Sequence, residues 1–490
     1  MNIVKIGVST ALVALVTAYA LAQRANVASP PREVHVTQDS RYQWGELHVA
    51  INPRNPNNIV YHSVGVTFCE PGNKSRDCES VPSKMDPPVP GFPGGNRQRG
   101  FYDNPDFTAV YAFYSFDRGK TWAKTRLPKA PRGFPALDDQ GDPSITVGPD
   151  GTFYASWDAN DWGTPEKTLP RAGVAVSKST DGGKSWSPPV LSGTPVDGPK
   201  LTADLNDGRI YVSSSTFLGP RSTGNSNVPM GTVNTRWLAS SRDGVRWTPV
   251  QPMGGSPGNM SAAHGLFAVA FRASDQGSGP FGAPNGQLCA PAKPPCTIFQ
   301  TTTNAGATWT RNVINVPNDH STALVAANPA RRGHFALALL RHNGGEYHLY
   351  QTRDSGKSWT GPAVVTEDGN RQHYHGAIAF SREGVLGLIW RSRVRPAPQP
   401  GQQPAQPFQQ PRTPYSVWGA IARDGGATFS TVQQMSTAES PFGKGAPGDD
   451  YSGIALDREY LYAGWADARP GDRGGYLAAL PFSSFKPKAR

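Results

Sequence analysis

Several features common in globular proteins are scarce in this sequence of 490 residues. Charged side chains make up only 17% of it, and no long segment shows the apolar spacing and capping residues of a helix. Gly (54) and Pro (47) are abundant instead, a composition typical of turn-rich all-β proteins. A chain of this length is too long for one ordinary core, so we expect a repeat or barrel architecture.

Long hydrophobic runs are absent after residue 22, which argues against an integral membrane protein. Segment 1–22 has an early Lys5, an apolar run and a small-x-small end at 20–22. It is interpreted as a signal peptide cleaved near Gln23, with an uncleaved anchor as the alternative, and 23–31 as a linker. We therefore expect export to the periplasm or the medium.

Cysteine is rare and falls into two close pairs. In an exported protein the spacing predicts two local disulfides, Cys69–Cys78 and Cys289–Cys296. The pairs lack the C-x2-C spacing and neighbouring His of a metal site, and no nucleotide loop is present, so no metal or cofactor is predicted. The net charge of +11, without nucleic-acid motifs, suggests an acidic glycan or an anionic surface as partner, with generic solubility as the alternative. We expect a monomer.

One short pattern, Ser/Thr-x-Asp-x-Gly-x-Ser/Thr-Trp, recurs six times. The Asp carboxylate of such a turn accepts backbone N–H groups, Gly supplies a positive φ, and the aromatic ring packs back onto the sheet. Three copies deviate: Asn304 replaces Asp in one, another is one residue short, and the last ends in Phe429. The copies are "FYSFDRGKTWAKT" (113–125), "SKSTDGGKSWSPP" (177–189), "ASSRDGVRWTPV" (239–250), "QTTTNAGATWTRN" (300–312), "QTRDSGKSWTGP" (351–362) and "AIARDGGATFSTV" (420–432).

This pattern is the Asp box, and the chain resembles the sialidase-type BNR-repeat β-propellers. Each box follows a predicted hairpin, such as "GDPSITVGPDGTFYASWDAN" at 141–160, so one unit reads as strands A, B, C, Asp box and strand D. A further hairpin at 451–469 and the strand at 474–482 lack a box, and "REVHVTQ" (32–38) supplies their missing strand. We predict an all-β fold, a single propeller over 32–490 with seven four-stranded blades, and six blades as the alternative. Insertions are predicted at 66–108, 274–296 and 393–414.

Function is expected where strands A begin and strands B end, since these positions line the central funnel of a propeller. Arginines after strands B would suit a carboxylate, because a guanidinium binds it through two hydrogen bonds. The candidate catalytic residues are Tyr451, Glu46, Asp142, Asp158 and His375, and the candidate substrate-binding residues are Arg272, Arg341, Arg391, Arg469, His320 and Tyr374. His264 is also placed at the start of a strand A. For Arg469 the alternative is a salt bridge with Asp467 that locks the last blade.

Three functions follow from these residues. The resemblance implies a glycoside hydrolase acting on a carboxylate-bearing sugar, with Tyr451 as nucleophile, Glu46 as its base and Asp142 or Asp158 as the acid. The cluster "NRQHYHG" (370–376) suits a uronate lyase instead. A non-catalytic glycan-binding or interaction propeller is the third, favoured by the absence of the Phe/Tyr-Arg-Ile-Pro motif that opens sialidase catalytic domains.

Overall fold

The fold was analysed in a computed structural model. It describes residues 29–38, 43–66, 108–128, 139–160, 172–194, 198–215, 236–253, 260–273, 286–316, 320–341, 344–366, 370–395, 414–441, 451–469 and 474–488, and all structural statements concern these ranges. Their regular structure is almost entirely β-strand, with two short 3-10 helices, η2 (Gly286–Cys289) and η3 (Phe482–Ser484). The predicted signal peptide and the pair Cys69–Cys78 lie outside the described residues.

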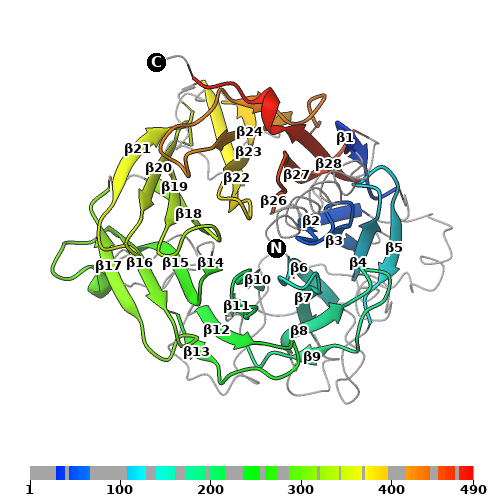
Figure 1. Ribbon diagram of the computed structural model, residues 1–490, viewed down its shortest axis with the longest axis horizontal. Coiled ribbons are helices and arrows are strands. Elements are labelled where there is room, and N and C mark those ends of the chain that lie inside the picture. Colours follow the sequence, from blue (N-terminus) through cyan, green and yellow to red (C-terminus); the bar gives the residue numbers. More distant parts are fainter. Residues whose placement is uncertain are drawn as a thin grey trace, which may run out of the picture.

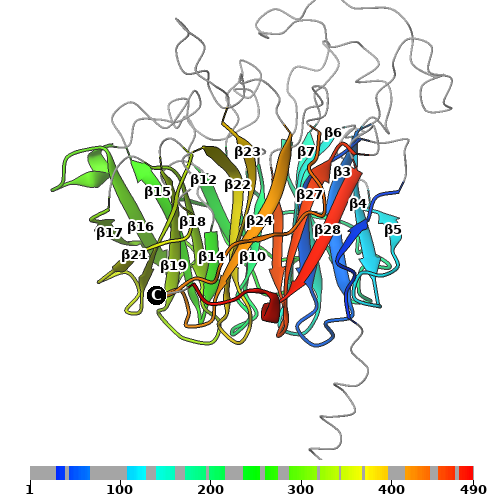
Figure 2. The ribbon, with the colours of Figure 1, turned by 90° about the horizontal axis from the view of Figure 1, so that it is seen from above.

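Seven antiparallel sheets surround a central axis (Figure 1), and each sheet has four strands within the described ranges. The A strands of neighbouring blades contact one another around the axis, so they form the inner wall. Figure 2 views the ring edge-on and shows the strands crossing its thickness. The prediction of seven blades is confirmed, and the alternative of six is wrong.

The first six blades follow the chain in the order A to D. Blade one contains β2 (Gln43–Ile51), β3 (Ile59–Val66), β4 (Thr108–Ser115) and β5 (Ala123–Arg126), and blade two β6 (Asp139–Val147), β7 (Phe153–Asn160), β8 (Ala172–Ser179) and β9 (Val190–Leu191). Blade three contains β10 (Lys200–Ala203), β11 (Ile210–Ser215), β12 (Arg236–Ser241) and β13 (Gln251–Pro252), and blade four β14 (Met260–Ala263), β15 (Leu266–Ala273), β16 (Cys296–Thr302) and β17 (Thr310–Ile314). Blade five contains β18 (His320–Ala327), β19 (Phe335–Arg341), β20 (Tyr347–Thr352) and β21 (Thr360–Val364), and blade six β22 (Arg371–Phe380), β23 (Leu386–Val394), β24 (Tyr415–Ala422) and β25 (Gln433–Gln434).

Blade seven joins the two ends of the chain. Its inner strands are β26 (Gly453–Leu456), β27 (Tyr460–Asp467) and β28 (Gly474–Pro481), and β1 (Glu33–His35) pairs with β28 as the outer strand (Figure 1). This is the segment to which the sequence analysis assigned ring closure. Arg469 contacts Glu33 at 3.0 Å and the buried Asp467 at 2.8 Å, so an ion-pair network spans the closure.

The hydrophobic core lies between the faces of neighbouring blades. Val60 and Ala112 of blade one, for example, pack in one cluster with Phe153 and Trp157 of blade two. The strands B and C are buried on both faces, which explains their continuous apolar and small-residue sequences.

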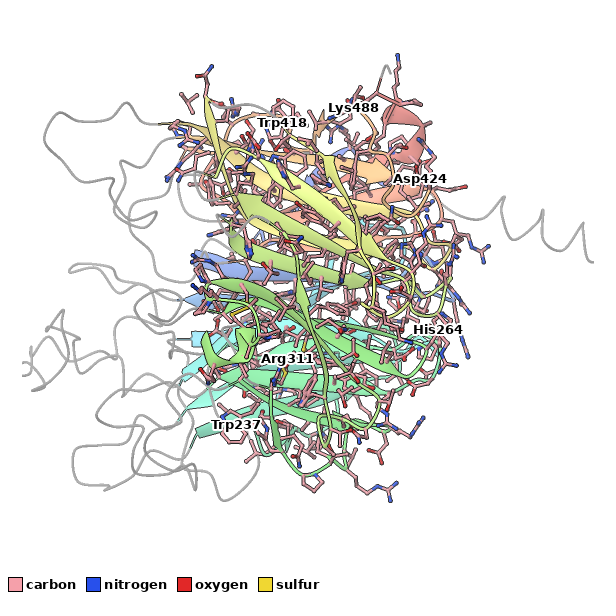
Figure 3. The ribbon with its side chains drawn as sticks, turned by 90° about the vertical axis from the view of Figure 1, so that its left-hand side faces the viewer. Trp237, His264, Arg311, Trp418, Asp424 and Lys488 are labelled. Atoms are coloured by element: carbon pink, nitrogen blue, oxygen red, sulfur yellow. A yellow bond between two sulfur atoms is a disulfide. The ribbon has the colours of Figure 1, made fainter. Side chains whose placement is uncertain are left out.

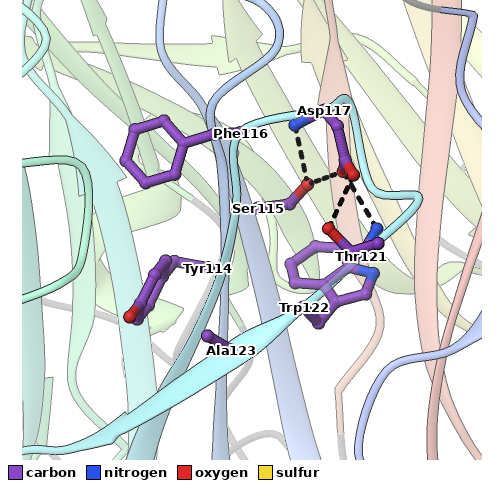
Figure 4. Close-up of a pocket in the computed structure, with 7 residues that line it drawn as sticks. All are labelled: Tyr114, Ser115, Phe116, Asp117, Thr121, Trp122 and Ala123. Carbon is purple, nitrogen blue, oxygen red and sulfur yellow. Dashed lines mark hydrogen bonds between the residues drawn. The ribbon is translucent and has the colours of Figure 1, made fainter.

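The Asp boxes close the C–D turns as their sequence predicts. In the first box, Asp117 accepts hydrogen bonds from the Thr121 N–H (2.9 Å) and from the hydroxyls of Thr121 (2.6 Å) and Ser115 (2.7 Å; Figure 4). The Trp122 indole donates to the Gly119 carbonyl (2.9 Å). A shallow pocket lies against this box at the outer edge of the ring. Both oxygens of Asp117 already accept hydrogen bonds within the turn, so the pocket is a by-product of a structural element.

Asn304 keeps the same turn although it replaces Asp. Its amide oxygen accepts the Thr308 N–H (2.9 Å), and its amide nitrogen donates to the Thr308 hydroxyl (2.9 Å), which reverses only the direction of the side-chain bond. The predicted bond Cys289–Cys296 is present and fixes η2 beside β16.

Candidate functional site

The two faces of the ring differ in what they carry. In four antiparallel strands, the A–B and C–D turns share one face, and the starts of strands A and ends of strands B share the other, which we call the mouth. Figure 3 shows His264 on the same side of the molecule as Asp424 of the sixth box, with Trp237, near the start of a strand C, on the opposite side. His264 follows β14 in an A–B turn, so its predicted placement at the start of a strand A is wrong.

Three strands A carry the same distortion near the mouth. In β2, β6 and β22, two consecutive residues of strand A lie opposite a single residue of strand B, so the regular pairing is interrupted. The first of the two residues is Glu46 in β2, Asp142 in β6 and His375 in β22. Their φ angles are 53°, 49° and 47°. This is the geometry of a bulge whose first position is normally glycine, and a side chain there is strained.

The repetition of this strained position points to function. Elsewhere among the described residues, positive φ angles of non-glycine residues occur only in turns, at Arg118, His264, Ala305 and Ser355. A bulge redirects a side chain that would otherwise face the neighbouring blade. Three acidic or imidazole side chains held this way on the inner strands mark the mouth as the site to examine, because backbone strain concentrates at functional positions.

Tyr451, Asp142 and Glu46 come together from three blades. The Tyr451 hydroxyl donates to Asp142 Oδ1 at 2.7 Å, and the Asp142 N–H donates to Glu46 Oε2 at 2.7 Å. Asp142 and Tyr451 are half-buried and Glu46 is buried. The Tyr451 phenol is thus bonded to the Asp142 carboxylate, and the Glu46 carboxylate is bonded to the backbone N–H of Asp142. Three groups that can accept or donate protons therefore lie close together.

Lys200 completes this cluster from the first position of β10. Its ammonium lies 3.1 Å from the centroid of the Tyr451 ring and 3.3 Å from His48 Nε2, to which it donates. A cation against the ring favours negative charge on the phenol oxygen. The site therefore has a fixed positive charge that can meet a carboxylate or stabilise a phenolate.

Two histidines in the cluster are uncharged at neutral pH. Burial, followed by the charge of Lys200 and by His62, holds the pKa of His48 well below its usual range. Burial lowers the pKa of His62 to about 3, although its Nδ1–H donates to the Ser144 carbonyl (3.3 Å). The two histidines pair across β2 and β3, and His48 contacts both Lys200 and the Tyr451 ring, so these two residues lie next to uncharged imidazoles.

Two arginines lie near Tyr451. Arg391 is fully buried and donates to the Tyr451 carbonyl (2.8 Å) and the Ser452 hydroxyl (3.0 Å), so it holds the peptide of Tyr451. A side chain at Gly198 would meet both Arg236 Nη2 and the Tyr451 hydroxyl, each at 3.8 Å. The guanidinium of Arg236 therefore lies near the phenol.

A second group gathers on blade six. The ring of Tyr374 contacts His375 edge-on, with centroids 4.9 Å apart, and the guanidinium of Arg393 lies 5.3 Å from the Tyr374 centroid. Burial, then the charges of Arg391 and Arg393, hold the pKa of His375 well below its usual range. The cluster thus holds a neutral imidazole on which two guanidinium charges act.

The remaining predicted residues have local partners or positions of their own. Arg341 pairs with Glu346 (3.2 Å), His320 is buried 2.6 Å from the Thr297 hydroxyl, and Arg272 lies within β15. Asp158 is buried opposite Gly141, one residue before Asp142. Arg469 has the salt bridge with Asp467 that the sequence indicated as its alternative role.

Sequence reasoning missed Lys200 and His48. Lys200 begins a strand A, so the rule that selected the other candidates also applies to it. His48 had no such signal, because only the bulge at Glu46 sets its direction toward Lys200. Within the described residues, no helix has the length and hydrophobicity to span a bilayer.

Comparison with known proteins bears on the repeat and the fold. The model of the BNR/Asp-box repeat matches residues 113–124, and no curated protein matches the chain. Among solved structures it is similar to a protein of unknown function from Dyadobacter fermentans (16% identity, 93% of this chain and 100% of that chain covered, TM-score 0.46). It is also similar to a Hadza microbial sialidase, with 17% identity, 78% of this chain and 75% of that chain covered, and a TM-score of 0.42. A variant of the NanB sialidase from Streptococcus pneumoniae has 10% identity, with 93% of this chain and 98% of that chain covered and a TM-score of 0.42.

The chain is a β-propeller. More particularly, it is a seven-bladed propeller with a BNR/Asp-box repeat at residues 113–124, and its mouth joins Tyr451, Asp142, Glu46 and Lys200.

Proposed function

We propose that this protein is an exported, monomeric glycoside hydrolase that acts on a carboxylate-bearing sugar at the mouth of the propeller. The observation that carries the proposal is the hydrogen bond between Tyr451 and Asp142, 309 positions apart in the sequence. A phenol paired with a carboxylate suits attack on the anomeric carbon of an anionic sugar, because the neutral hydroxyl approaches the substrate and the carboxylate takes its proton.

The reaction then proceeds in two balanced steps. The Tyr451 oxygen bonds to the anomeric carbon while its proton passes to Asp142, and Glu46, as the acid, protonates the departing glycosidic oxygen. Glu46 and Asp142 thus exchange the roles expected from the sequence, because it is Asp142 that accepts the hydrogen bond of the Tyr451 hydroxyl. Water next attacks the same carbon, Glu46 accepts its proton, and Tyr451 leaves and regains its proton from Asp142. Lys200 offsets negative charge on the phenol oxygen or on the sugar carboxylate.

Export rests on two features. Segment 1–22 has the composition of a signal peptide, and the bond Cys289–Cys296 is compatible with an oxidising compartment. Mass spectrometry of the protein from culture medium and periplasm tests this. A mature chain that starts near Gln23 is expected, and full-length protein retained in the cytoplasm would contradict export.

Product analysis tests the activity. The purified protein would be incubated with sialosides and with uronate glycans, and its products weighed. Fragments that gain one water support a hydrolase, and unsaturated fragments identify a lyase. The absence of products would support a non-catalytic binding propeller.

Matched variants locate the activity. Tyr451→Phe and Asp142→Asn should each lower kcat by at least about 100-fold, since each removes a group that takes part in bond formation or proton transfer. Tyr114→Phe and Asp424→Asn are the controls, because both lie at Asp boxes away from the mouth, and Asn304 shows that such a turn accepts Asn. Equal activity in all four variants would exclude the Tyr451 site.

A further inference from the structure

The structure points to a second ligand group on blade six. We propose that His375, Tyr374 and Arg393 bind a second oxyanion of the same substrate, a carboxylate or a sulfate, so that the substrate is a glycan with at least two acidic groups. This inference rests on the proposed function, because it extends the site at Tyr451 across the mouth.

Geometry is the first support. His375 occupies in β22 the same strained bulge position that Glu46 and Asp142 occupy in β2 and β6. Those two residues meet at Tyr451. Glycine would fill the bulge without strain, so a fold that needed only the bulge gains nothing from an imidazole there.

Hydrogen bonding is the second support. His375 Nδ1 is buried and makes no hydrogen bond with any described residue. Such a group costs free energy unless a partner arrives. Strain and an unmet nitrogen on one side chain are both explained if a ligand supplies that partner.

Charge identifies the ligand. Arg391 pairs with Tyr374 across β22 and β23, and the guanidinium of Arg393 lies 5.3 Å from the centroid of the Tyr374 ring. After burial, the positive charges of both arginines are what lowers the pKa of His375. An oxyanion at this position accepts a hydrogen bond from the imidazole and is attracted by both guanidinium groups, whereas a cation would be repelled.

The two groups are close enough to serve one ligand. Blades six and seven are neighbours, and β22 contacts β26, the strand that Tyr451 precedes. Arg391 links them directly, since it lies near His375 and holds the Tyr451 carbonyl. A substrate with one acidic group at Lys200 can therefore place the next on blade six.

The test compares ligands that differ by one charge. Binding would be measured by calorimetry, with Tyr451→Phe to prevent turnover, for a uronic acid disaccharide with both carboxylates and with one of them reduced to the alcohol, and for galactose with one and with two sulfates. In at least one pair we expect the dianionic ligand to bind at least 10-fold more tightly. Which pair shows the preference tells carboxylate from sulfate.

His375→Gly in the same background should abolish that preference while affinity for the monoanionic ligand stays unchanged. This variant is expected to fold, because glycine is the natural residue of the bulge. Arg393→Gln should reduce the preference in the same direction. Ser355→Gly is the matched control, since it relieves a similar φ of 65° in an Asp box on the other face and should leave binding unchanged.

A preference that survives His375→Gly, or no preference for either pair, overturns the second site. The proposed hydrolase fails separately, if the unmodified protein binds the dianion but yields no products. Hydrolysis without a dianion preference would keep the Tyr451 site and refute only the inference about blade six.

Discussion

Arg391 holds Tyr451 by its backbone: the buried guanidinium donates to the Tyr451 carbonyl at 2.8 Å. An arginine that the sequence presents as a substrate clamp therefore acts first on the position of the proposed nucleophile. Its hydrogen bonds to Tyr451 and Ser452 use separate nitrogens of the rigid fork. Lysine cannot reproduce that geometry.

Arg391→Lys should accordingly lower kcat about 10-fold with a smaller change in KM, because a misplaced nucleophile slows bond formation more than binding. It should also lower the free energy of unfolding by about 2 kcal/mol, since a buried carbonyl loses its donor. Steady-state kinetics and urea titration measure both. Arg246→Lys, at a side chain that is 90% exposed, is the control. Unchanged kcat and stability in Arg391→Lys would contradict the positioning role.

Lys200→Met should lower kcat by about 10- to 100-fold, because the ammonium next to the Tyr451 ring no longer stabilises negative charge on its oxygen. Lys200→Arg should recover part of the rate, since a guanidinium also interacts with an aromatic face. Lys184→Met removes a similar contact, 4.6 Å from the Phe116 centroid at the outer edge, and should not change kcat. If Lys200→Met is as active as the control, Lys200 has no part in the reaction.

Acid should begin to destabilise the fold before the carboxylates titrate. The folded pKa of His62 is about 3, below its ordinary 6.5, so the unfolded chain binds a proton more readily. Its contribution to stability is complete above pH 6.5 and is lost as the pH falls toward 3. Thermal melts from pH 8 to 3 would show this decline.

His62→Asn, which keeps a donor for the Ser144 carbonyl, should flatten the upper part of that curve. The Asp boxes act in a lower window. Hydrogen bonds from the Ser358 side chain and backbone lower the pKa of Asp354 to about 2, so its contribution disappears only below pH 3.8. A variant curve that matches the original between pH 6.5 and 4 would show that His62 is not responsible.

Arg469→Ala should lower the free energy of unfolding by about 3 kcal/mol, because it leaves the buried charge of Asp467 without its cation. The same change separates Glu33 of β1 from blade seven. Arg458→Ala is the matched control: its side chain is 76% exposed and pairs with Glu383, so its loss should change stability by less than about 0.5 kcal/mol. Equal urea midpoints for the two variants would refute a role for Arg469 in closure.

Local signals made the fold predictable. An Asp box specifies its own turn through hydrogen bonds within five residues, as those between Asp117 and Thr121 show. Each box therefore marks the position of one C–D turn in the sequence. The strand at 33–35 was recognisable because blade seven lacked a partner for β28. His264 was misplaced because β14 has only four residues, Met260–Ala263, too few to show the alternation of a strand.

The site was harder to predict, because side-chain direction depends on non-local packing. In a propeller the side chains of a regular strand face the adjacent blades, so a polar residue at the right place in the sequence can still be buried, as Arg391 is. Only the bulges turn the side chains of Glu46, Asp142 and His375 away from the adjacent blades, and no sequence signal marks a bulge that lacks glycine. The partnership of Tyr451 with Asp142 likewise depends on how the ring closes.

The shared last blade sets an order of events during synthesis. β1 leaves the ribosome before the other described strands and its partner β28 after them, so blade seven must wait for the other six blades. Tyr451 belongs to that blade and Asp142 to the second, so their contact forms only when the circle is complete. The proposed catalytic pair is therefore absent from every unfinished chain, and the appearance of hydrolase activity would time the final step of folding.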